Sequence, residues 1–489
     1  MRLALRLGTT RPLGDSPPAV PPFPFPTVAT RLRYRPESGG SWVEVAGTAM
    51  GVPDTNRVVH TVHIEGLAPD TTYEIDLPNL PNTSIYTTYC DDPTTTLTVH
   101  WHTLKPLLGG GYANEPFSNM ASGRSLKSFT APSSIAGGEF RVAQLSDTHG
   151  QANEVDLIVA ASAADHHLIV HSGDVATGNG GTSSPQTWYQ FFNDLRLAVD
   201  TQGRTIPFIP NIGNHEVRGG GSGLQWLGDR GFKPDFNTGQ RGDAEWYYCF
   251  FPRFPGLRGF GLLDFGDYLS VFVIDPGIST LLEDPSDNQR DWLETALSAR
   301  QTVPHKIATL HYSPWPVGRR PMNLSFRTVR EVLGPVWHAG GVRVVLVGHD
   351  HVLSYTVPID SWGLADHQSP QTPAAVGDGI EFFGAGPAGG RAGPGARSGR
   401  NPATKWWMAD SRASIWEQYD FEEPGWDGPA LEAETRDPHP DDMTEFGNDD
   451  VRHYWSLTLT PTGRQISAVT AEGETWVTLD RGIDPDMSE

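Results

Sequence analysis

Five short polar motifs occur after residue 138, and most of them directly follow a predicted β-strand. Strands and helices alternate along this part of the chain, which favours a layered α/β domain. In open α/β sheets, catalytic groups gather at the carboxyl ends of the strands, so motifs from separate strands can meet in one crevice. The five motifs are Ser146-Asp147-Thr148-His149, Gly173-Asp174, Gly213-Asn214-His215-Glu216, His311 and Gly348-His349-Asp350-His351.

The predicted strands of this region are short apolar runs bounded by turn residues. They are Phe140–Leu145, Leu168–His171, Pro207–Pro210, Leu269–Ile274, Lys306–Leu310 and Arg343–Val347, with Trp455–Leu459 and Gln465–Thr470 as closing strands.

Three helices are predicted among these strands. The first covers Asn153–Ala164, and the second follows Ser184-Pro185, which supply an N-cap and a first-turn proline. The third follows a capping box made of Ser286 and Gln289. The second buries an apolar stripe of Trp188, Phe191, Phe192 and Leu195, and the third buries Trp292, Leu293, Ala296 and Leu297.

The residues before position 136 follow a different pattern. Residues 1–27 are a proline-rich lead-in. Residues 28–135 contain short β-branched and aromatic runs separated by turn residues, which predicts a β-sandwich. Within it, Gly66–Tyr73 resembles the turn and tyrosine-bearing strand of fibronectin type III domains. The predicted domains are therefore a sandwich at 28–135 and an α/β domain at 136–489.

The side chains of the five motifs are types that bind transition metals. In an extended backbone, residues i and i+2 point the same way, so Asp147 with His149, and His349 with His351, are each expected to offer two ligands. Imidazoles, carboxylates and an amide, without a thiolate, suit Mn, Fe or Zn better than Ca. The motifs offer more ligands than one tetrahedral ion can bind. Two ions that share a bridging carboxylate could use them all.

Charge and cysteine content exclude other classes of protein. The 489 residues carry a formal net charge of −22, so no general affinity for nucleic acid or an anionic membrane is expected. Cys90 and Cys249 are the only cysteines, which excludes a disulfide scaffold and a thiolate zinc site but leaves one bridge open.

Two further expectations concern membranes and targeting. The sequence has no apolar run long enough for a transmembrane helix. Its first residues lack the apolar run of an ordinary signal peptide, so a cytoplasmic location is the default expectation and an extracellular one stays open.

In this order and spacing, the five motifs resemble the metallophosphoesterase (calcineurin-like) superfamily. The fibronectin-like segment ahead of them resembles the purple acid phosphatase branch, and the likeness covers most of residues 138–390. The resemblance implies a four-layer α/β/β/α catalytic domain that holds two divalent transition-metal ions, which would be Mn, Fe or Zn.

The resemblance also implies a role for each motif residue. The first ion would be held by Asp147, His149, Asp174 and His351, and the second by Asp174, Asn214, His311 and His349. Asp174 would bridge the two ions. His215 would act near the leaving group as a general acid or transition-state stabiliser, and Glu216 would orient it.

Two positions depart from the purple acid phosphatase pattern. That branch usually has a glycine where His149 stands and a metal-bound tyrosine where Thr177 stands. The number of ligands is kept, but the tyrosinate–iron(III) colour is expected to be absent. In this respect the site is similar to the class III cyclic-nucleotide phosphodiesterase branch.

The N-terminal segment departs from the pattern in its strand order. Asp91–Trp101 resembles the opening strands of the phosphatase sandwich, yet it follows segments that resemble later strands. Either the sandwich is circularly permuted or one of these resemblances is accidental.

The resemblance implies that the protein hydrolyses phosphate monoesters, as acid phosphatases do, and that its substrate is a small phosphorylated molecule. A phosphodiesterase acting on nucleotides or phospholipid head groups is the alternative within the same chemistry. A non-enzymatic surface or attachment protein with a vestigial phosphatase scaffold is the alternative from another class. Histidines outside the motifs, namely His100, His102, His166, His167 and His171, are expected to have structural roles.

Overall fold

A computed structural model of the chain describes most of the strands and helices that the sequence predicts. No helix among the described residues is long and apolar enough to cross a membrane. The described residues are 30–52, 55, 57–77, 84–104, 125–150, 155–177, 185–217, 244–255, 259–280, 282–283, 288–315, 324–349, 354–356, 358–360, 362, 377–385, 407–409 and 452–483.

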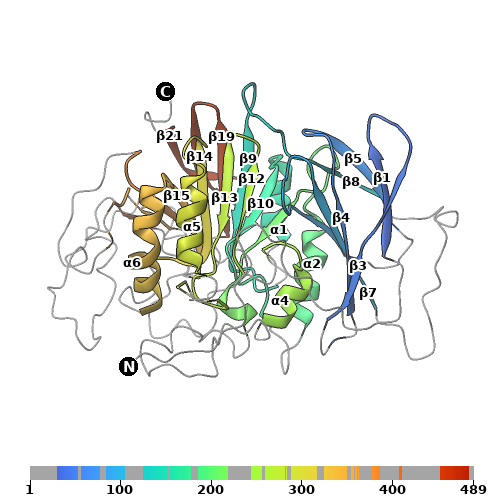
Figure 1. Cartoon of the computed structure of the whole chain (residues 1–489), viewed down its shortest axis with the longest axis horizontal. Coiled ribbons are helices and arrows are strands. Elements are labelled where there is room, and N and C mark those ends of the chain that lie inside the picture. The colour runs from blue at the N-terminus through green and yellow to red at the C-terminus, as the bar shows by residue number, and fades with distance from the viewer. Residues whose placement is uncertain are drawn as a thin grey trace.

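Two β-sheets pack face to face in the middle of the molecule, with helices on their outer faces (Figure 1). This mixed α/β arrangement confirms the predicted fold class. In spatial order, the larger sheet contains β21 (Thr475–Gly482), β20 (Gly463–Thr470), β19 (His453–Thr460), β9 (Phe140–Leu145), β10 (Leu168–His171), β11 (Phe208–Pro210), β6 (Ile85–Thr88), β7 (Leu97–Leu104), β4 (Arg57–Ile64) and β3 (Thr48–Gly51).

The second sheet carries the other half of the motif-bearing strands. In spatial order, it contains β12 (Gly261–Phe265), β13 (Leu269–Val273), β14 (His305–Tyr312), β15 (Val344–Gly348), β17 (Glu381–Gly384), β16 (Ser354–Thr356) and β18 (Trp407–Ala409). The strands β9, β10 and β11 run parallel to one another, and so do β13, β14, β15 and β17. Parallel strands end at the same edge of a sheet, so their carboxyl-terminal loops are neighbours.

Alternating side chains divide the apolar core into layers. In β9, Phe140 and Val142 face the second sheet, whereas Ala143 and Leu145 face the helices. The helices on that side are α1 (Val155–Ala163), α2 (Gln186–Leu195) and α4 (Glu245–Phe250). On the far side, α5 (Gln289–Ser298) and α6 (Leu324–Ala339) pack against the second sheet. The α/β/β/α layering therefore follows from the period-2 pattern of the strands.

The N-terminal strands continue the larger sheet. Strand β6 pairs in parallel with β11 through Thr88 and Phe208, so the sheet runs across the boundary expected near residue 136. A separate sheet packs on this extension, with Leu32 and Ile75 in the same core cluster as Trp101. In spatial order it contains β2 (Val43–Ala46), β1 (Arg31–Pro36), β5 (Thr72–Asp76) and β8 (Ser125–Phe129).

Two local observations in this region concern segments on which the predicted fibronectin likeness rests. The backbone N–H of Ala68 donates a 2.7 Å hydrogen bond to the hydroxyl of Tyr73, which closes the turn predicted from Gly66–Tyr73. Strand β7, at the end of the segment Asp91–Trp101, lies between β6 and β4. The domain division, the fibronectin type III assignment and the permuted order stay predictions.

Some local predictions differ from the structure. Helix α5 begins after Asn288, whose side chain accepts the N–H of Asp291, so the capping box predicted from Ser286 and Gln289 is wrong. Gln289 instead bonds the backbone of Asp275. Helix α2 begins after Pro185, which is its N-cap, so the N-cap predicted at Ser184 is wrong by one position. Ser184 itself lies outside the described residues.

Two other features of the sequence have a clear outcome. The two cysteines are free and buried, so the disulfide left open by the sequence is absent. Helix α6 was not predicted, because Gly334 and Pro335 interrupt its apolar pattern.

Several histidines are buried as neutral, hydrogen-bonded groups. His166, for example, contacts the Ala161 carbonyl at 2.7 Å and the Ser456 hydroxyl at 2.8 Å. Burial lowers the pKa of His60, His166 and His305 to about 4 and that of His100 and His171 to about 3. The structural roles expected for His100 and His166 are confirmed by these contacts.

These histidines predict that acid destabilises the fold. A histidine whose pKa is about 4 in the folded chain binds a proton more readily when the chain is unfolded. Its contribution to the free energy of unfolding is therefore complete above pH 6.5 and is lost as the pH falls toward 4. One such group removes about 2 kcal/mol at pH 5. Urea titrations at pH 7.5 and pH 5 should therefore give a lower free energy of unfolding at pH 5. The variant His305→Gln keeps a donor for the Thr460 carbonyl, and its free energy of unfolding should depend less steeply on pH. Equal stability at the two pH values would contradict the prediction.

Candidate metal centre

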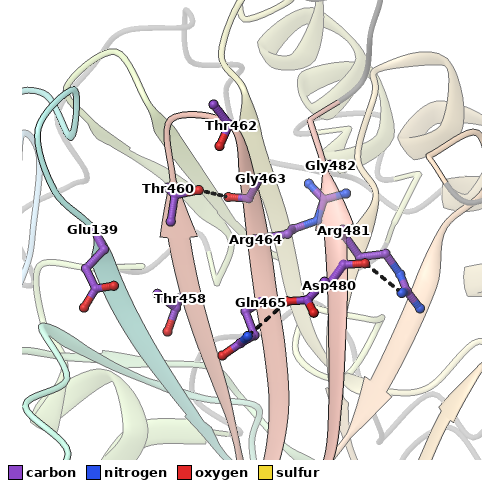
Figure 2. Close-up of a pocket in the computed structure, with 10 residues that line it drawn as sticks. All are labelled: Glu139, Thr458, Thr460, Thr462, Gly463, Arg464, Gln465, Asp480, Arg481 and Gly482. Carbon is purple, nitrogen blue, oxygen red and sulfur yellow. Dashed lines mark hydrogen bonds between the residues drawn. The ribbon is translucent and has the colours of Figure 1, made fainter.

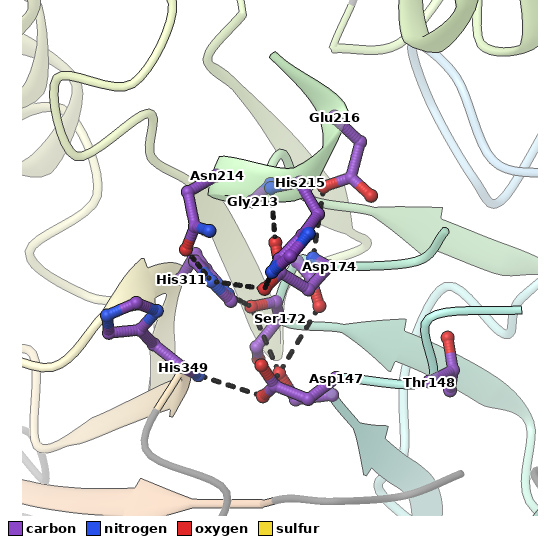
Figure 3. Close-up of polar contacts among 12 residues, drawn as sticks. Asp147, Thr148, Ser172, Asp174, Gly213, Asn214, His215, Glu216, His311 and His349 are labelled. Carbon is purple, nitrogen blue, oxygen red and sulfur yellow. Dashed lines mark hydrogen bonds and ion pairs between the residues drawn. The ribbon is translucent and has the colours of Figure 1, made fainter. Parts of the chain in front are cut away.

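The motif residues meet where the carboxyl edges of the two sheets come together (Figure 3). The larger sheet and the second sheet each contribute imidazoles to this cluster. The contributing segments are the loops after β9 (Asp147, His149) and β10 (Asp174), the 3-10 turn η3 after β11 (Asn214, His215, Glu216), strand β14 (His311) and the loop after β15 (His349). His351, the remaining expected ligand, lies outside the described residues, as does Asp350.

Two groups of ligand atoms share one carboxylate. The ligand atoms of His149, Asp174 and His215 lie within 4.8 Å of one another, and so do those of Asp174, His311 and His349. The Asp174 Oδ2 atom is 3.2 Å from His311 Nε2 and 3.9 Å from His215 Nε2. Asp174 is therefore common to both groups.

Asp147 and Asn214 lie at the borders of these groups. The Asp147 Oδ2 atom accepts the backbone N–H of His349 at 2.8 Å and the hydroxyl of Ser146 at 2.7 Å. The Asn214 Oδ1 atom lies 3.0 Å from His311 Nε2. Each of these residues therefore links segments that come from different sheets.

Most of these side chains are buried. The side chain of His215 is 35% exposed, whereas those of Asp174 and His311 are at most 1% exposed. The His215 ring lies edge-on to the His149 ring at 4.7 Å between centroids. His215 is therefore the group of this cluster that a solute can reach most easily.

The ligand loops adopt a left-handed backbone. The φ angles are +56° at Asp147, +54° at His149, +55° at Asp174 and +74° at His349. The extended geometry predicted for Asp147 and His149 is therefore wrong. A non-glycine residue in this region costs roughly 1–3 kcal/mol and clusters of them are typical of functional sites.

Hydrogen bonds between the loops hold this conformation. The N–H of Asp147 donates to the carbonyl of Gly173 at 3.1 Å, and the N–H of His149 donates to the carbonyl of Asp174 at 3.0 Å. The loops after β9 and β10 thus constrain each other.

Glycines allow the loops and sheets to touch. A Cβ atom on Gly173 would lie 2.7 Å from His311 Nδ1, and one on Gly348 would lie 1.9 Å from the Ser146 hydroxyl. Both contacts join the larger sheet to the second one. A Cβ on Gly213 would meet the backbone nitrogen of Asp174 at 2.1 Å. The glycines of three motifs are therefore explained by close approach.

Glu216 organises the backbone and does not contact the His215 ring. Its carboxylate accepts the N–H groups of Gly213, Asp174 and Ala176 at 2.6–3.0 Å. Burial, followed by the nearby Asp174 charge, raises the pKa of Glu216 to about 8, against the effect of these donors. The carboxylate ties η3 to the loop that carries Asp174, a role that differs from the orienting contact expected from the sequence.

The charges of the cluster are strongly coupled. Burial lowers the pKa of His311, but the charge and hydrogen bond of Asp174 raise it overall, to about 9. Burial raises the pKa of Asp174, but His311 and His215 hold it well below its usual range. His311 Nδ1 donates to the Ser172 carbonyl at 2.8 Å, which leaves Nε2 directed at Asp174 and Asn214. A metal ion at Nε2 would replace a proton there.

The donor set fits divalent transition metals. It combines several imidazoles, a shared carboxylate and an amide oxygen, which is the mixture that Mn, Fe and Zn accept. Ser172, whose carbonyl fixes the tautomer of His311, was not among the predicted site residues; its position directly before Gly173 and Asp174 was the available signal.

A groove elsewhere on the molecule has a different character. It lies on β19, β20 and β21 and has a volume of about 510 Å³ (Figure 2). Its polar side chains pair with neighbours, as in the 3.0 Å bond from Gln465 to Asp480 and the ion pair of Arg481 with Glu381. None of its described lining residues belongs to the five motifs, so this groove is not part of the metal cluster.

Comparison with known proteins gives one family match. Residues 140–353 match the model of the calcineurin-like phosphoesterase family, a segment shorter than half of the chain that contains all five motifs. The match supports a calcineurin-like metallophosphoesterase domain in this part of the chain, as the sequence motifs predict. No curated protein matches the sequence.

Similar solved structures have low sequence identity to this chain. A purple acid phosphatase from yellow lupin (Lupinus luteus) seeds is similar with a TM-score of 0.55 and 15% identity, over 94% of this chain and 70% of that chain. PhoD has a TM-score of 0.47 and 13% identity, over 86% and 88%. GAP50, the anchor in the inner membrane complex of Plasmodium, has a TM-score of 0.39 and 13% identity, over 71% and 89%. The likeness to the lupin enzyme concerns the fold.

The close approach at Gly173 predicts that an added methyl group there lowers the stability of the fold. Gly173→Ala and Gly203→Ala both place an alanine at positive φ, +91° and +76°, but only Gly173 has neighbours within 4 Å of the added Cβ. Gly173→Ala should therefore lower the free energy of unfolding by about 1–3 kcal/mol more than Gly203→Ala does. Urea unfolding of the metal-depleted proteins measures this difference. Equal losses would show that the sheets do not touch at Gly173 as described.

Proposed function

We propose that the chain is a phosphoesterase that depends on two divalent transition-metal ions and hydrolyses phosphate monoesters. The observation that carries the proposal is the position of Asp174, whose carboxylate belongs to both ligand groups. The family match of residues 140–353 supports phosphoester hydrolysis as the reaction class.

The residues divide into ligands and a proton donor. Asp147, His149, Asp174 and His351 would hold one ion, as the sequence motifs predict. Asp174, Asn214, His311 and His349 would hold the other. When bound, two such ions lower the pKa of a water molecule and withdraw charge from the phosphoryl oxygens.

His215 is suited to act on the leaving group. Its ring is the most exposed of the cluster, and its backbone N–H donates to Asp174 Oδ1 at 2.8 Å, which fixes its position beside the shared carboxylate. In the proposed reaction, His215 donates a proton to the departing alcohol oxygen or stabilises the charge that develops there.

Phosphodiester hydrolysis is the second candidate. The observation that favours it is His149, which lies within the first ligand group, at a position where purple acid phosphatases usually have glycine. Thr177, at the position of the expected tyrosine, is exposed. Nucleotides and phospholipid head groups are the substrate classes for this alternative.

Metal analysis tests the shared carboxylate. Elemental analysis of the protein saturated with Mn²⁺ or Zn²⁺ should find about two ions per chain. Asp174→Ala should lose both ions, because its carboxylate serves both groups. Asp264→Ala removes a carboxylate of β12 that pairs with Arg300, and this variant should keep both ions. Retention of one ion by Asp174→Ala would argue against a shared ligand.

Hydrolysis of model esters tests the reaction and its substrate class. The saturated protein should hydrolyse p-nitrophenyl phosphate faster than bis(p-nitrophenyl) phosphate, and the reverse order would select the phosphodiesterase. A protein that binds two ions but hydrolyses neither these esters nor a wider panel would support the non-enzymatic alternative.

His215→Asn tests the proton donor. The variant should keep both ions, and its kcat should fall by about 10²–10⁴-fold, the usual contribution of general acid–base catalysis. Parallel metal analysis separates this role from ligation. Loss of an ion in His215→Asn would identify His215 as a ligand, consistent with its place in the first group.

A further inference from the structure

Polar residues interrupt the inter-sheet core directly below the metal cluster. The side chains that face the opposite sheet change from apolar to polar as the strands approach their carboxyl ends. The rows are Phe140, Val142 and Gln144 in β9, then Leu168, Val170 and Ser172 along β10 and its end, and Ile307, Thr309 and His311 in β14. A polar layer thus separates the apolar core from the ligands.

Hydrogen bonds connect this layer across the two sheets. The Gln144 Nε2 atom donates to the Val347 carbonyl of β15 at 2.8 Å and to the Ser172 hydroxyl at 3.0 Å. The Ser172 and Thr309 hydroxyls are 3.1 Å apart, and Gln144, Ser172 and Thr309 are all fully buried. A carbonyl only accepts, so the bond to Val347 fixes the orientation of the Gln144 amide.

Each bonded group stands just before a ligand. Gln144 precedes Asp147 by three residues, whereas Ser172, Thr309 and Val347 precede Asp174, His311 and His349 by two. The network therefore joins β9, β10, β14 and β15 at the level where each strand turns into its ligand segment. The pairing between β14 and β15 shifts register between Thr309 and Tyr312, so β-sheet bonding alone does not fix His311 there.

We propose that Gln144, Ser172 and Thr309 are positioning residues that set the separation of the two sheets, and hence of the two ligand groups. This inference rests on the metal-dependent function proposed above. Asp147 and Asp174 come from one sheet, and His311 and His349 from the other. A sliding of one sheet by a fraction of an ångström changes every distance across the centre, and the polar bonds resist that sliding because they are directional, unlike apolar contacts.

A purely structural role makes a different prediction. Buried hydrogen bonds contribute to stability wherever they lie, so their loss alone lowers the unfolding temperature of the metal-free protein. A positioning role also weakens metal binding by the folded protein. Removal of residues that orient ligands typically costs about 10–100-fold in metal affinity.

The experiment is a calorimetric titration of metal-depleted protein with Mn²⁺, at a temperature where circular dichroism shows each variant to be folded. Ser172→Ala removes a hydroxyl that bonds a threonine hydroxyl at 3.1 Å. Ser467→Ala is the matched control, because Ser467 bonds Thr478 at 3.0 Å in β20 and β21 of the same sheet, away from the cluster. Ser172→Ala should bind Mn²⁺ about 10–100-fold more weakly, and Ser467→Ala should bind it as the unaltered protein does.

A second pair of variants provides the rescue. Thr309→Val keeps the shape of the side chain but removes its hydroxyl, whereas Thr309→Ser keeps the hydroxyl. Affinity should fall in the valine variant and return in the serine variant. Gln144→Met, which removes the bond to Val347, should weaken binding in the same way as Ser172→Ala.

The outcomes separate this inference from the proposed function. Unchanged Mn²⁺ affinity in Ser172→Ala and Gln144→Met, with only lower unfolding temperatures, would overturn the positioning role. Failure of the unaltered protein to bind Mn²⁺ would overturn the metal centre and this role together. An unaltered protein whose Mn²⁺ affinity depends on Ser172 but which hydrolyses no ester would support the positioning role and overturn the catalytic proposal alone.

Discussion

The close contact of two sheets at their carboxyl edges is the constraint on which the rest of the site depends. The backbone at Gly173 and the ring of His311 are too close for any added Cβ, and Gly348 stands in the same relation to Ser146. This contact brings imidazoles from both sheets close to one carboxylate, Asp174. Parallel strands supply the ligands, because each strand ends at the same edge of its sheet.

The cluster stores strain and buried charge. Left-handed backbone at Asp147, His149, Asp174 and His349 is unfavourable for side chains of this kind, and it is held by hydrogen bonds between the loops. Carboxylates and imidazoles buried together also lose their hydration, a cost that mutual attraction offsets only in good geometry. In the proposed function, divalent ions bound between these groups would offset that cost further.

The sequence allowed much of this site to be predicted. Short apolar runs located β9, β10, β14 and β15 closely, and a polar residue after a buried strand is a direct sign of the functional edge of an α/β sheet. The backbone conformation of Asp147 and His149 was not predictable in this way, because their left-handed angles depend on partners in the loop after β10. The partners of Glu216 were missed for the same reason, since they are backbone groups that sequence does not distinguish.

The continuity of the larger sheet could not be predicted from the sequence either. The pairing of Thr88 with Phe208 joins segments far apart in the chain, and neither segment carries a pattern that specifies the other. Aromatic contacts support the junction, as where Tyr86 stacks on Phe192 at 4.6 Å between ring centroids. The N-terminal strands therefore extend the sheet that carries three of the five motifs.

The proposed metal centre would place one ion on each side of Asp174, between residues from the two sheets. Anomalous X-ray diffraction from crystals of the Mn²⁺-saturated protein tests it most directly. If the two ions share Asp174, two anomalous peaks should lie roughly 3.5–4 Å apart, both within coordination distance of the Asp174 carboxylate, one toward His149 and the other toward His311 and His349. A single peak, or peaks that do not share Asp174, would contradict it.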